Sequence, residues 1–169
     1  MQRACQERLS EEGYAQYEVS AYARDGRWCA HNVNYWTFGD YLGVGAGAHG
    51  KITTAANGSI TRRSKLRHPR DYLREAGGDG RLATSQVLRP ADAAFEFMLN
   101  ALRLVDGFAV PLFQERTGLA VSMLEPGLAE AEGRGLIERD HLHIRPTERG
   151  RRFLNDLLML FLPADAVTA

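Results

Sequence analysis

The pattern of apolar and polar residues in the first half of the chain predicts one helix followed by short strands. A helical stripe over residues 2–12 ends at Gly13. The next segment, YAQYEVSAYA, alternates apolar and polar side chains, which predicts a single strand over residues 14–23. Residues 41–48, with a glycine-rich end, and residues 59–63 are predicted as two further strands.

The second half changes to helical periodicity. Its elements are expected in the order helix, helix, helix, hairpin, helix, which is typical of a winged helix-turn-helix domain. A short helix through Leu73 precedes this region and is broken by Gly77-Gly78. We therefore place the domain boundary between about residues 78 and 89, which gives domains over residues 1–87 and 88–169. The expected bounds are 90–105, 111–118 and 122–133 for three helices, 136–145 for the hairpin, and a final helix that Thr147 caps.

Two details refine this α+β prediction. Ser122 is the expected N-cap of the third helix, with Glu125 completing a capping box. The final helix is expected to continue past Phe153 and to end before Pro163.

Composition narrows the class of protein. The 169 residues include 21 Lys plus Arg and 21 Asp plus Glu, so the overall charge does not favour nucleic acid as a partner. Residues 88–169 hold nine basic and twelve acidic residues, a net charge of minus three, which argues against contact with DNA phosphates. No apolar run approaches the roughly 20 residues that span a bilayer. Cys5 and Cys29 form no CxxC pair, and we expect a cytoplasmic protein.

The stretch HNVNYWTFGDYLGVGAGAHG, residues 31–50, carries the candidate chemistry. The imidazole of His31 is a candidate iron ligand, and Tyr35 shares its face on a helical turn. A flat apolar ligand would gain contact area there, although a hydrogen-bonded core histidine is the ordinary alternative. The glycines at 43, 45 and 47 do not form a GxGxxG fingerprint, and they indicate close approach of a backbone or a ligand.

Three ordered segments, YEVSAYA, HNVNYW and DYLGVGAGAHG, resemble the haem chaperone subfamily of radical SAM proteins. This subfamily is closely related to oxygen-independent coproporphyrinogen III oxidase. The resemblance covers the whole chain. It implies the C-terminal remnant of a radical SAM (β/α) barrel followed by a winged-helix-like domain.

The resemblance also implies roles for particular residues. The HNxxYW motif, associated with haem, falls on His31, Asn32, Tyr35 and Trp36, with His31 as the candidate axial ligand of the haem iron. The YEVS stretch, around Glu18 and Ser20, matches a late barrel strand whose end faces the active-site cavity. The segment expected near S-adenosylmethionine in intact relatives comprises Gly45, Ala46, Gly47, Ala48 and His49. His49 is either a second polar contact there or a loop residue.

The chain departs from this family in one large respect. Intact relatives carry CxxxCxxC, whose thiolates hold a 4Fe–4S cluster that binds S-adenosylmethionine, and this motif is absent here. We therefore expect no radical chemistry from the isolated chain, and Met1 is equally compatible with a start or with an internal methionine of a longer protein. Because barrel neighbours are missing, residues 1–87 are expected to be irregular, or stabilised by homodimer formation through exposed strands or by strand exchange.

Three functions remain open from the sequence. The first is a haem-delivery protein that hands haem to haem-requiring respiratory proteins. The second is part of a coproporphyrinogen III oxidase in porphyrin biosynthesis, and the third is a winged-helix interaction module. The basic stretch TRRSKLRHPR, residues 61–70, faces either an anionic ligand, such as haem propionates, or an acidic partner, or else is a solvated connection. His141 and His143 give a weak metal signal without a further ligand nearby.

Overall fold

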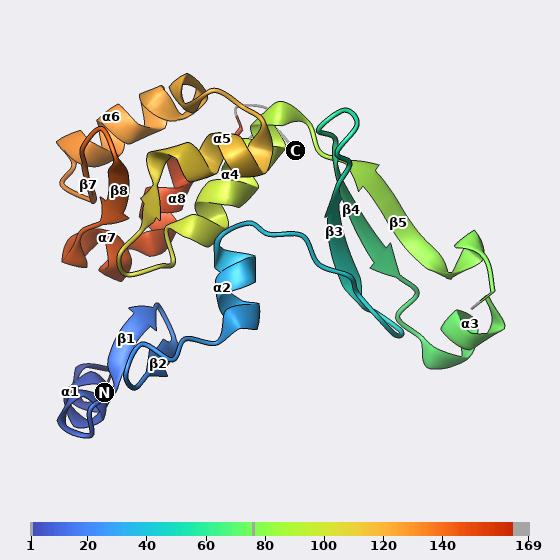
Figure 1. Cartoon of the computed structure of the whole chain (residues 1–169), viewed down its shortest axis with the longest axis horizontal. Coiled ribbons are helices and arrows are strands. Elements are labelled where there is room, and N and C mark those ends of the chain that lie inside the picture. The colour runs from blue at the N-terminus through green and yellow to red at the C-terminus, as the bar shows by residue number, and fades with distance from the viewer. Residues whose placement is uncertain (1, 76, 164–169) are drawn as a thin grey trace. The chain divides into compact units, whose positions relative to one another are not determined.

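The computed structural model describes residues 2–75 and 77–163 (Figure 1). These residues form two compact units. One unit combines the chain up to Phe38 with the chain from Ala94 onward, and the other comprises Gly39–Ala93. The units do not follow a boundary at residue 87, and the division into sequence domains 1–87 and 88–169 remains a prediction.

The first unit begins with α1 (Gln2–Glu11), which confirms the predicted first helix, and Gly13 ends it with φ of 78°. The single strand expected over residues 14–23 is wrong, because the chain forms a hairpin there, with β1 (Ala15–Glu18) antiparallel to β2 (Ala21–Ala23). The turn closes at Ser20, whose backbone N–H and hydroxyl both donate to the carboxylate of Glu18. Helix α2 (Ala30–Trp36) follows.

Backbone hydrogen bonds join this hairpin to a segment much later in the chain. The N–H of Val19 donates to the carbonyl of Arg103 at 3.1 Å, and the N–H of Val105 donates to the carbonyl of Tyr17 at 3.0 Å. The early hairpin therefore belongs to the same unit as the C-terminal helices.

The C-terminal region contains the expected order of helix, helix, helix, hairpin and helix (Figure 1). Its strands form a three-stranded antiparallel sheet in the order β6-β8-β7. The helices are α4 (Pro90–Ala101), α5 (Val110–Thr117), α6 (Glu125–Gly133), α7 (Glu148–Arg152) and α8 (Leu154–Met159), and the strands are β6 (Phe108–Ala109), β7 (Ile137–Arg139) and β8 (His143–Pro146).

An aromatic cluster forms the core of this unit. Phe97 of α4 is fully buried and contacts Phe38, Phe108 and Phe113 edge-on, with ring centroids 5.0 to 5.9 Å apart. Edge-to-face contacts at this spacing are the favoured geometry for aromatic pairs. Phe38, two residues after the end of α2, therefore packs against helix α4 through Phe97.

Several helix ends differ from expectation. Helix α6 begins only at Glu125, because Val121–Leu124 form a 3₁₀ turn (η2) in front of it, so Ser122 is not its N-cap and the capping box is absent. Thr147 does cap the next helix, accepting a hydrogen bond from the N–H of Gly150, as predicted. The final helix is not continuous, because Phe153 departs from helical geometry with ψ of 43° and separates α7 from α8.

The second unit is a three-stranded antiparallel sheet in the order β3-β4-β5, with β3 (His49–Thr53), β4 (Ile60–Lys65) and β5 (Leu82–Val87). The short helix α3 (Pro69–Arg74) and the 3₁₀ turn η1 (Asp79–Arg81) connect β4 to β5. Strand β4 and helix α3 confirm predictions, and β5 was not predicted. The strand expected over residues 41–48 is wrong, because positive φ at Gly45 and Gly47 interrupts the extended chain before β3 begins.

The expectation that residues 1–87 are irregular or need a second chain is also wrong for the part that the structure describes. Each strand there pairs antiparallel with another strand of the same chain. The homodimer itself remains a prediction. The α+β class is confirmed, and none of the helices within residues 2–75 and 77–163 is long and apolar enough to cross a membrane.

Candidate functional site

Helix α2 carries the HNVNYW motif at the surface of the first unit. Its imidazole, that of His31, is exposed and meets the ring of Tyr35 edge-on, with centroids 4.8 Å apart and planes at 71°. The four-residue spacing places both rings on one helical face, as the sequence predicted. Within the described residues the imidazole has no hydrogen-bond partner, and no group of three His, Cys, Asp or Glu residues could hold a metal ion. Asn32 lies on the same helix and is half-buried.

The last residue of α2, Trp36, is held by a cation. The guanidinium of Arg103 lies 4.5 Å from the centroid of the indole ring. The indole Nε1–H is buried and is the one such side-chain atom, among those described, with no hydrogen-bond partner. A buried donor of this kind is costly to leave without an acceptor, so its presence at the end of α2 calls for a physical explanation.

The position of Arg103 is fixed in turn by Glu18. Glu18 is 1% exposed, and its Oε1 accepts from Nε of Arg103 at 2.7 Å and lies 2.6 Å from Nη2. Its other oxygen accepts both hydrogen bonds from Ser20. Glu18, Arg103 and Trp36 therefore form a continuous chain of contacts from β1 to α2. Sequence reasoning singled out Glu18 and Trp36 but missed Arg103, because nothing local marks a residue 85 positions from its partner.

A second aromatic pair lies just before α2. The indole of Trp28 stacks on the ring of Tyr17, with centroids 5.3 Å apart and planes at 10°, and Trp28 remains 44% exposed. The exposed imidazole of His31, beside the ring of Tyr35, has the donor chemistry of a haem ligand. The residues present therefore fit a haem held through one imidazole.

The glycine-rich segment belongs to the second unit. Gly45 and Gly47 have φ of 98° and 70°, which favours glycine at both positions. A Cβ on Gly43 would lie 2.1 Å from the carbonyl oxygen of His49. The backbone at Gly43 and the backbone at His49 are therefore too close together for any side chain at position 43. His49 is exposed and opens β3 opposite Ser64. Ala46 is exposed and Ala48 is half-buried.

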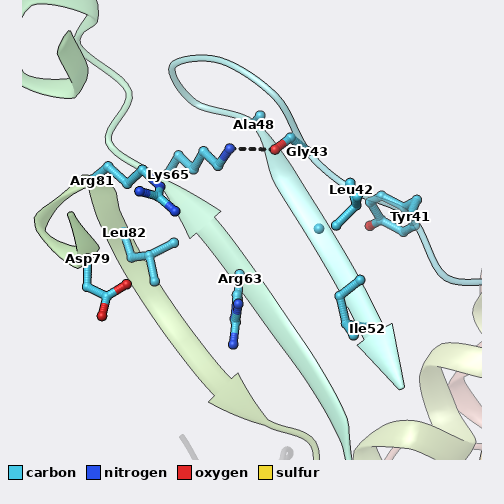
Figure 2. Close-up of a pocket in the computed structure, with 11 residues that line it drawn as sticks. Tyr41, Leu42, Gly43, Ala48, Ile52, Arg63, Lys65, Asp79, Arg81 and Leu82 are labelled. Atoms are coloured by element: carbon cyan, nitrogen blue, oxygen red, sulfur yellow. Dashed lines mark hydrogen bonds between the residues drawn. The ribbon is translucent and has the colours of Figure 1, made fainter. Parts of the chain in front are cut away.

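The loop borders a pocket of about 160 Å³ on the sheet of the second unit (Figure 2). Lys65 fixes one wall, because its Nζ donates to the carbonyl of Gly43 at 2.6 Å. The lining residues are Tyr41, Leu42, Gly43, Ala48, Gly50, Ile52, Arg63, Lys65, Asp79, Arg81 and Leu82.

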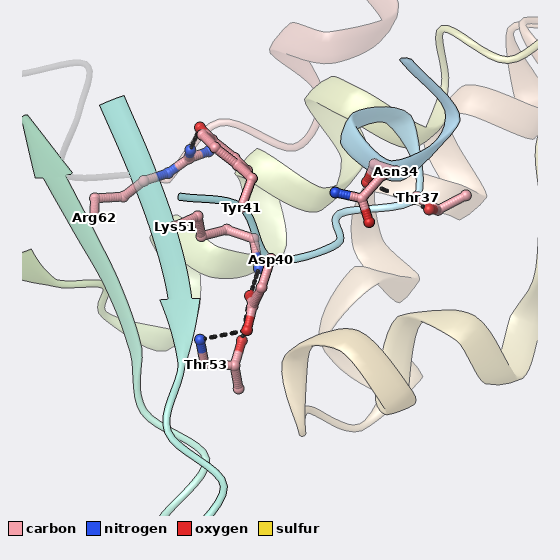
Figure 3. A network of polar contacts seen from close by, with 7 residues as sticks. All are labelled: Asn34, Thr37, Asp40, Tyr41, Lys51, Thr53 and Arg62. Carbon is pink, nitrogen blue, oxygen red and sulfur yellow. Dashed lines mark hydrogen bonds and ion pairs between the residues drawn. The ribbon is translucent and has the colours of Figure 1, made fainter. Parts of the chain in front are cut away.

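A buried lysine anchors the start of this unit. Lys51 is 1% exposed, and its Nζ donates to Oδ1 of Asp40 at 2.7 Å, while the N–H and hydroxyl of Thr53 also donate to that carboxylate (Figure 3). Burial alone would raise the pKa of Asp40, but the hydrogen bonds from Lys51 and Thr53 outweigh it and hold the pKa below its ordinary value. The ion pair satisfies a charge that would otherwise be buried alone.

The sequence-predicted residues thus fall into two groups. His31, Asn32, Tyr35 and Trp36 share one helix of the first unit, and residues 45–49 form the loop of the second. Helix α2 holds the first group together, and the loop that leads into β3 holds the second.

The chain is similar in sequence to a known protein family and to several characterised proteins. A family model described as the HemN C-terminal domain matches residues 88–153. The heme chaperone HemW of Escherichia coli (strain K12) is 44% identical over 155 residues, which cover 91% of this chain and 39% of that relative. HemW of Haemophilus influenzae is 44% identical over 154 residues with the same coverage. The mitochondrial radical S-adenosyl methionine domain-containing protein 1 of Bos taurus is 31% identical over 169 residues, covering 91% of this chain and 36% of that relative.

A solved structure also aligns with the chain. Coproporphyrinogen III oxidase (HemN) from Escherichia coli, a radical SAM enzyme, matches with a TM-score of 0.65 over 95% of this chain and 39% of that chain. At 17% identity this likeness shows a shared fold alone. The chain spans about two fifths of the length of the relatives it matches. These matches confirm the predicted resemblance: residues 88–153 match the HemN C-terminal domain, and the chain is similar to the C-terminal portion of proteins named heme chaperone HemW.

Proposed function

We propose that this chain is the haem-binding region of a haem-delivery protein and that it binds haem through the HNVNYW helix. The observation that carries the proposal is the exposed imidazole of His31 on α2, set edge-on against Tyr35 and without a hydrogen-bond partner in the described part of the chain. The 44% identity to proteins named heme chaperones supports haem as the cargo.

In this proposal the imidazole of His31 would hold the haem iron, and the ring of Tyr35 would restrict rotation of that imidazole. The chain of contacts from Glu18 through Arg103 to Trp36 holds the far end of the helix in place. One imidazole would hold haem less firmly than a site with two protein ligands. This suits a carrier that must protect haem and then release it.

The longer protein adds chemistry that this chain lacks. Its remaining portion would hold the 4Fe–4S cluster, and the segment Gly45, Ala46, Gly47, Ala48 and His49 would lie near bound S-adenosylmethionine. The isolated chain, without CxxxCxxC, would deliver haem and not run radical chemistry. Haem-requiring respiratory proteins in the cytoplasmic membrane would be its acceptors, with the carrier on the cytoplasmic side.

The competing oxidase function has one observation in its favour, the similarity of the fold to coproporphyrinogen III oxidase. The identity of 17% to that enzyme, against 44% to the heme chaperones, favours delivery over oxidation. Turnover of coproporphyrinogen III by the full-length, cluster-loaded protein separates the two functions.

A transfer assay tests the proposal directly. The chain is loaded with haemin, separated from excess haemin, and mixed with apomyoglobin while the Soret band is followed. We expect stoichiometric binding, quenching of the exposed Trp28, and transfer of the haem to apomyoglobin. Binding without saturation, or haem that never leaves, would overturn the delivery function.

A further inference from the structure

The pocket beside the glycine-rich loop has features of a binding site that is separate from the haem helix. It lies wholly within the second unit, and its walls come from the sheet, the loop that borders it and the 3₁₀ turn η1 (Figure 2). Its volume of about 160 Å³ matches cavities of about 150 Å³ that accommodate a molecule the size of benzene. The pocket therefore suits a small organic group.

The charge on the pocket walls points to an anion. Arg63, Lys65 and Arg81 line the pocket, against one carboxylate, Asp79, which leaves a net charge of plus two. The second unit as a whole holds nine basic and five acidic residues, a net charge of plus four, in a chain whose formal charge is zero. A basic concavity raises the local concentration of anions.

Arg63 is the cation most available to a ligand. Its side chain lines the pocket, is exposed, and forms no ion pair or hydrogen bond with any described residue (Figure 2). The ammonium of Lys65, by contrast, is already engaged by the carbonyl of Gly43. A planar guanidinium donates two parallel hydrogen bonds to a carboxylate, which is the pairing it favours.

The remaining walls are apolar. Leu42, Ile52 and Leu82 line the pocket, and Tyr41 borders it. Inorganic anions gain nothing from such surface, whereas an anion on a short hydrocarbon arm buries that arm against it. Cations and apolar walls together therefore select a carboxylate with an apolar arm.

We propose that this pocket binds an organic carboxylate on a short apolar arm, with Arg63 as the principal ligand of the carboxylate. The group is either a free short-chain acid or the propionate side chain of a larger molecule such as a porphyrin. The inference is independent of the role of His31, because it rests on residues of the other unit.

Nuclear magnetic resonance of the full chain tests the site with sodium butyrate as the probe and sodium chloride at equal ionic strength as the reference. The amides of Gly43 and Gly50, which line the pocket, are the reporters, and those of Gly118 and Gly135 in the first unit are the internal controls. We expect saturable shifts at the pocket glycines alone, with butyrate binding about tenfold tighter than acetate because of its two extra methylene groups.

Two matched variants complete the test. Arg63→Gln should weaken butyrate binding about tenfold, because the paired charge-assisted hydrogen bonds of the guanidinium are lost and the amide restores at most one neutral bond. Arg70→Gln removes the same charge from an exposed residue of α3 outside the pocket and should bind as the parent chain does. A well-dispersed spectrum for each variant shows that the fold is intact.

The outcomes are distinct. A metal-free dicarboxylic porphyrin is tested beside its dimethyl ester. If the porphyrin shifts the amide signals of Gly43 and Gly50 at a lower concentration than butyrate does, and the ester does not shift them, the pocket binds a propionate side chain. Butyrate binding without porphyrin binding assigns it to a free acid. Equal effects of butyrate and chloride, equal affinity for butyrate and inorganic phosphate, or equal weakening by both variants would overturn the proposal.

Discussion

The buried carboxylate of Glu18 lies 2.6 Å from Nη2 of Arg103, a residue 85 positions further along the chain. The pair joins the hairpin after α1 to the segment that follows α4. Because the guanidinium of Arg103 also covers the indole of Trp36, the ion pair sets the geometry at the end of the HNVNYW helix.

Breaking this pair should destabilise the first unit. In Glu18→Gln the guanidinium of Arg103 loses its counter-charge, and we expect the free energy of unfolding to fall by about 2–3 kcal/mol. This is less than a fully buried pair costs, because Arg103 is 30% exposed. Urea denaturation measures the loss. The control is Glu130→Gln, which breaks an exposed pair with Arg134 and should cost less than about 1 kcal/mol. Equal losses in the two variants would contradict the structural role of Glu18.

The cap of α7 offers a second test. The hydroxyl oxygen of Thr147 accepts a hydrogen bond from the N–H of Gly150 at 2.9 Å, and the hydroxyl donates to the carbonyl of Gly135 at 2.8 Å. Thr147→Ala removes both bonds and should lower stability by about 1–2 kcal/mol in thermal or urea unfolding. Thr147→Ser keeps the hydroxyl and should stay within about 0.5 kcal/mol of the parent chain. A serine variant as unstable as the alanine variant would show that the hydroxyl is not the cause.

The close approach inside the glycine-rich loop gives a third prediction. In Gly43→Ala the new methyl would overlap the carbonyl oxygen of His49, so the loop must move, and we expect a loss of more than about 2 kcal/mol in the stability of the second unit. Hydrogen exchange of the β3 amides reports on this unit separately from the rest. Gly77→Ala, at a position with open space around it, is the matched control and should leave those amides protected.

The ion pair of Asp40 and Lys51 makes the stability of the fold depend on pH. The pKa of Asp40 is lowered in the folded chain from its ordinary value of 3.8, so the ionised carboxylate stabilises the fold above that value, and the contribution is lost as the pH falls through the folded pKa. We compare urea midpoints of the parent chain and Asp40→Asn from about pH 6 to about pH 3. The parent chain should be the more stable at the upper limit, with the gap narrowing toward the lower limit. A gap that stays constant with pH would show that ionisation of Asp40 is not its source.

Local patterns predicted the elements that local forces determine. The helices with a clear apolar stripe and the cap at Thr147 follow from side chains within a few residues of one another. The hairpin of β7 and β8 was likewise visible as two short apolar runs around a turn. The resemblance of three short segments to a known family was also sufficient to identify the relatives.

The failures have particular physical causes. Alternation over residues 14–23 suggested one strand, but the carboxylate of Glu18 closes a turn through Ser20 and splits it. Strand β5 was missed because all its residues beyond Leu82 are exposed and its pairing with β4 is set by partners 17 to 26 residues away. Arg103 was missed at the candidate site for the same reason, since a contact across 85 positions leaves no local signal.

The axial ligand is the central claim, and absorption spectroscopy during haemin titration tests it most directly. The parent chain, His31→Ala and His141→Ala are titrated in parallel, the last removing an exposed imidazole from the β7–β8 turn as the matched control. We predict a saturable Soret shift for the parent chain and for His141→Ala, and its loss in His31→Ala. Identical spectra for all three proteins would contradict haem ligation by His31 and leave the HNVNYW helix with the packing role that Trp36 and Arg103 already give it.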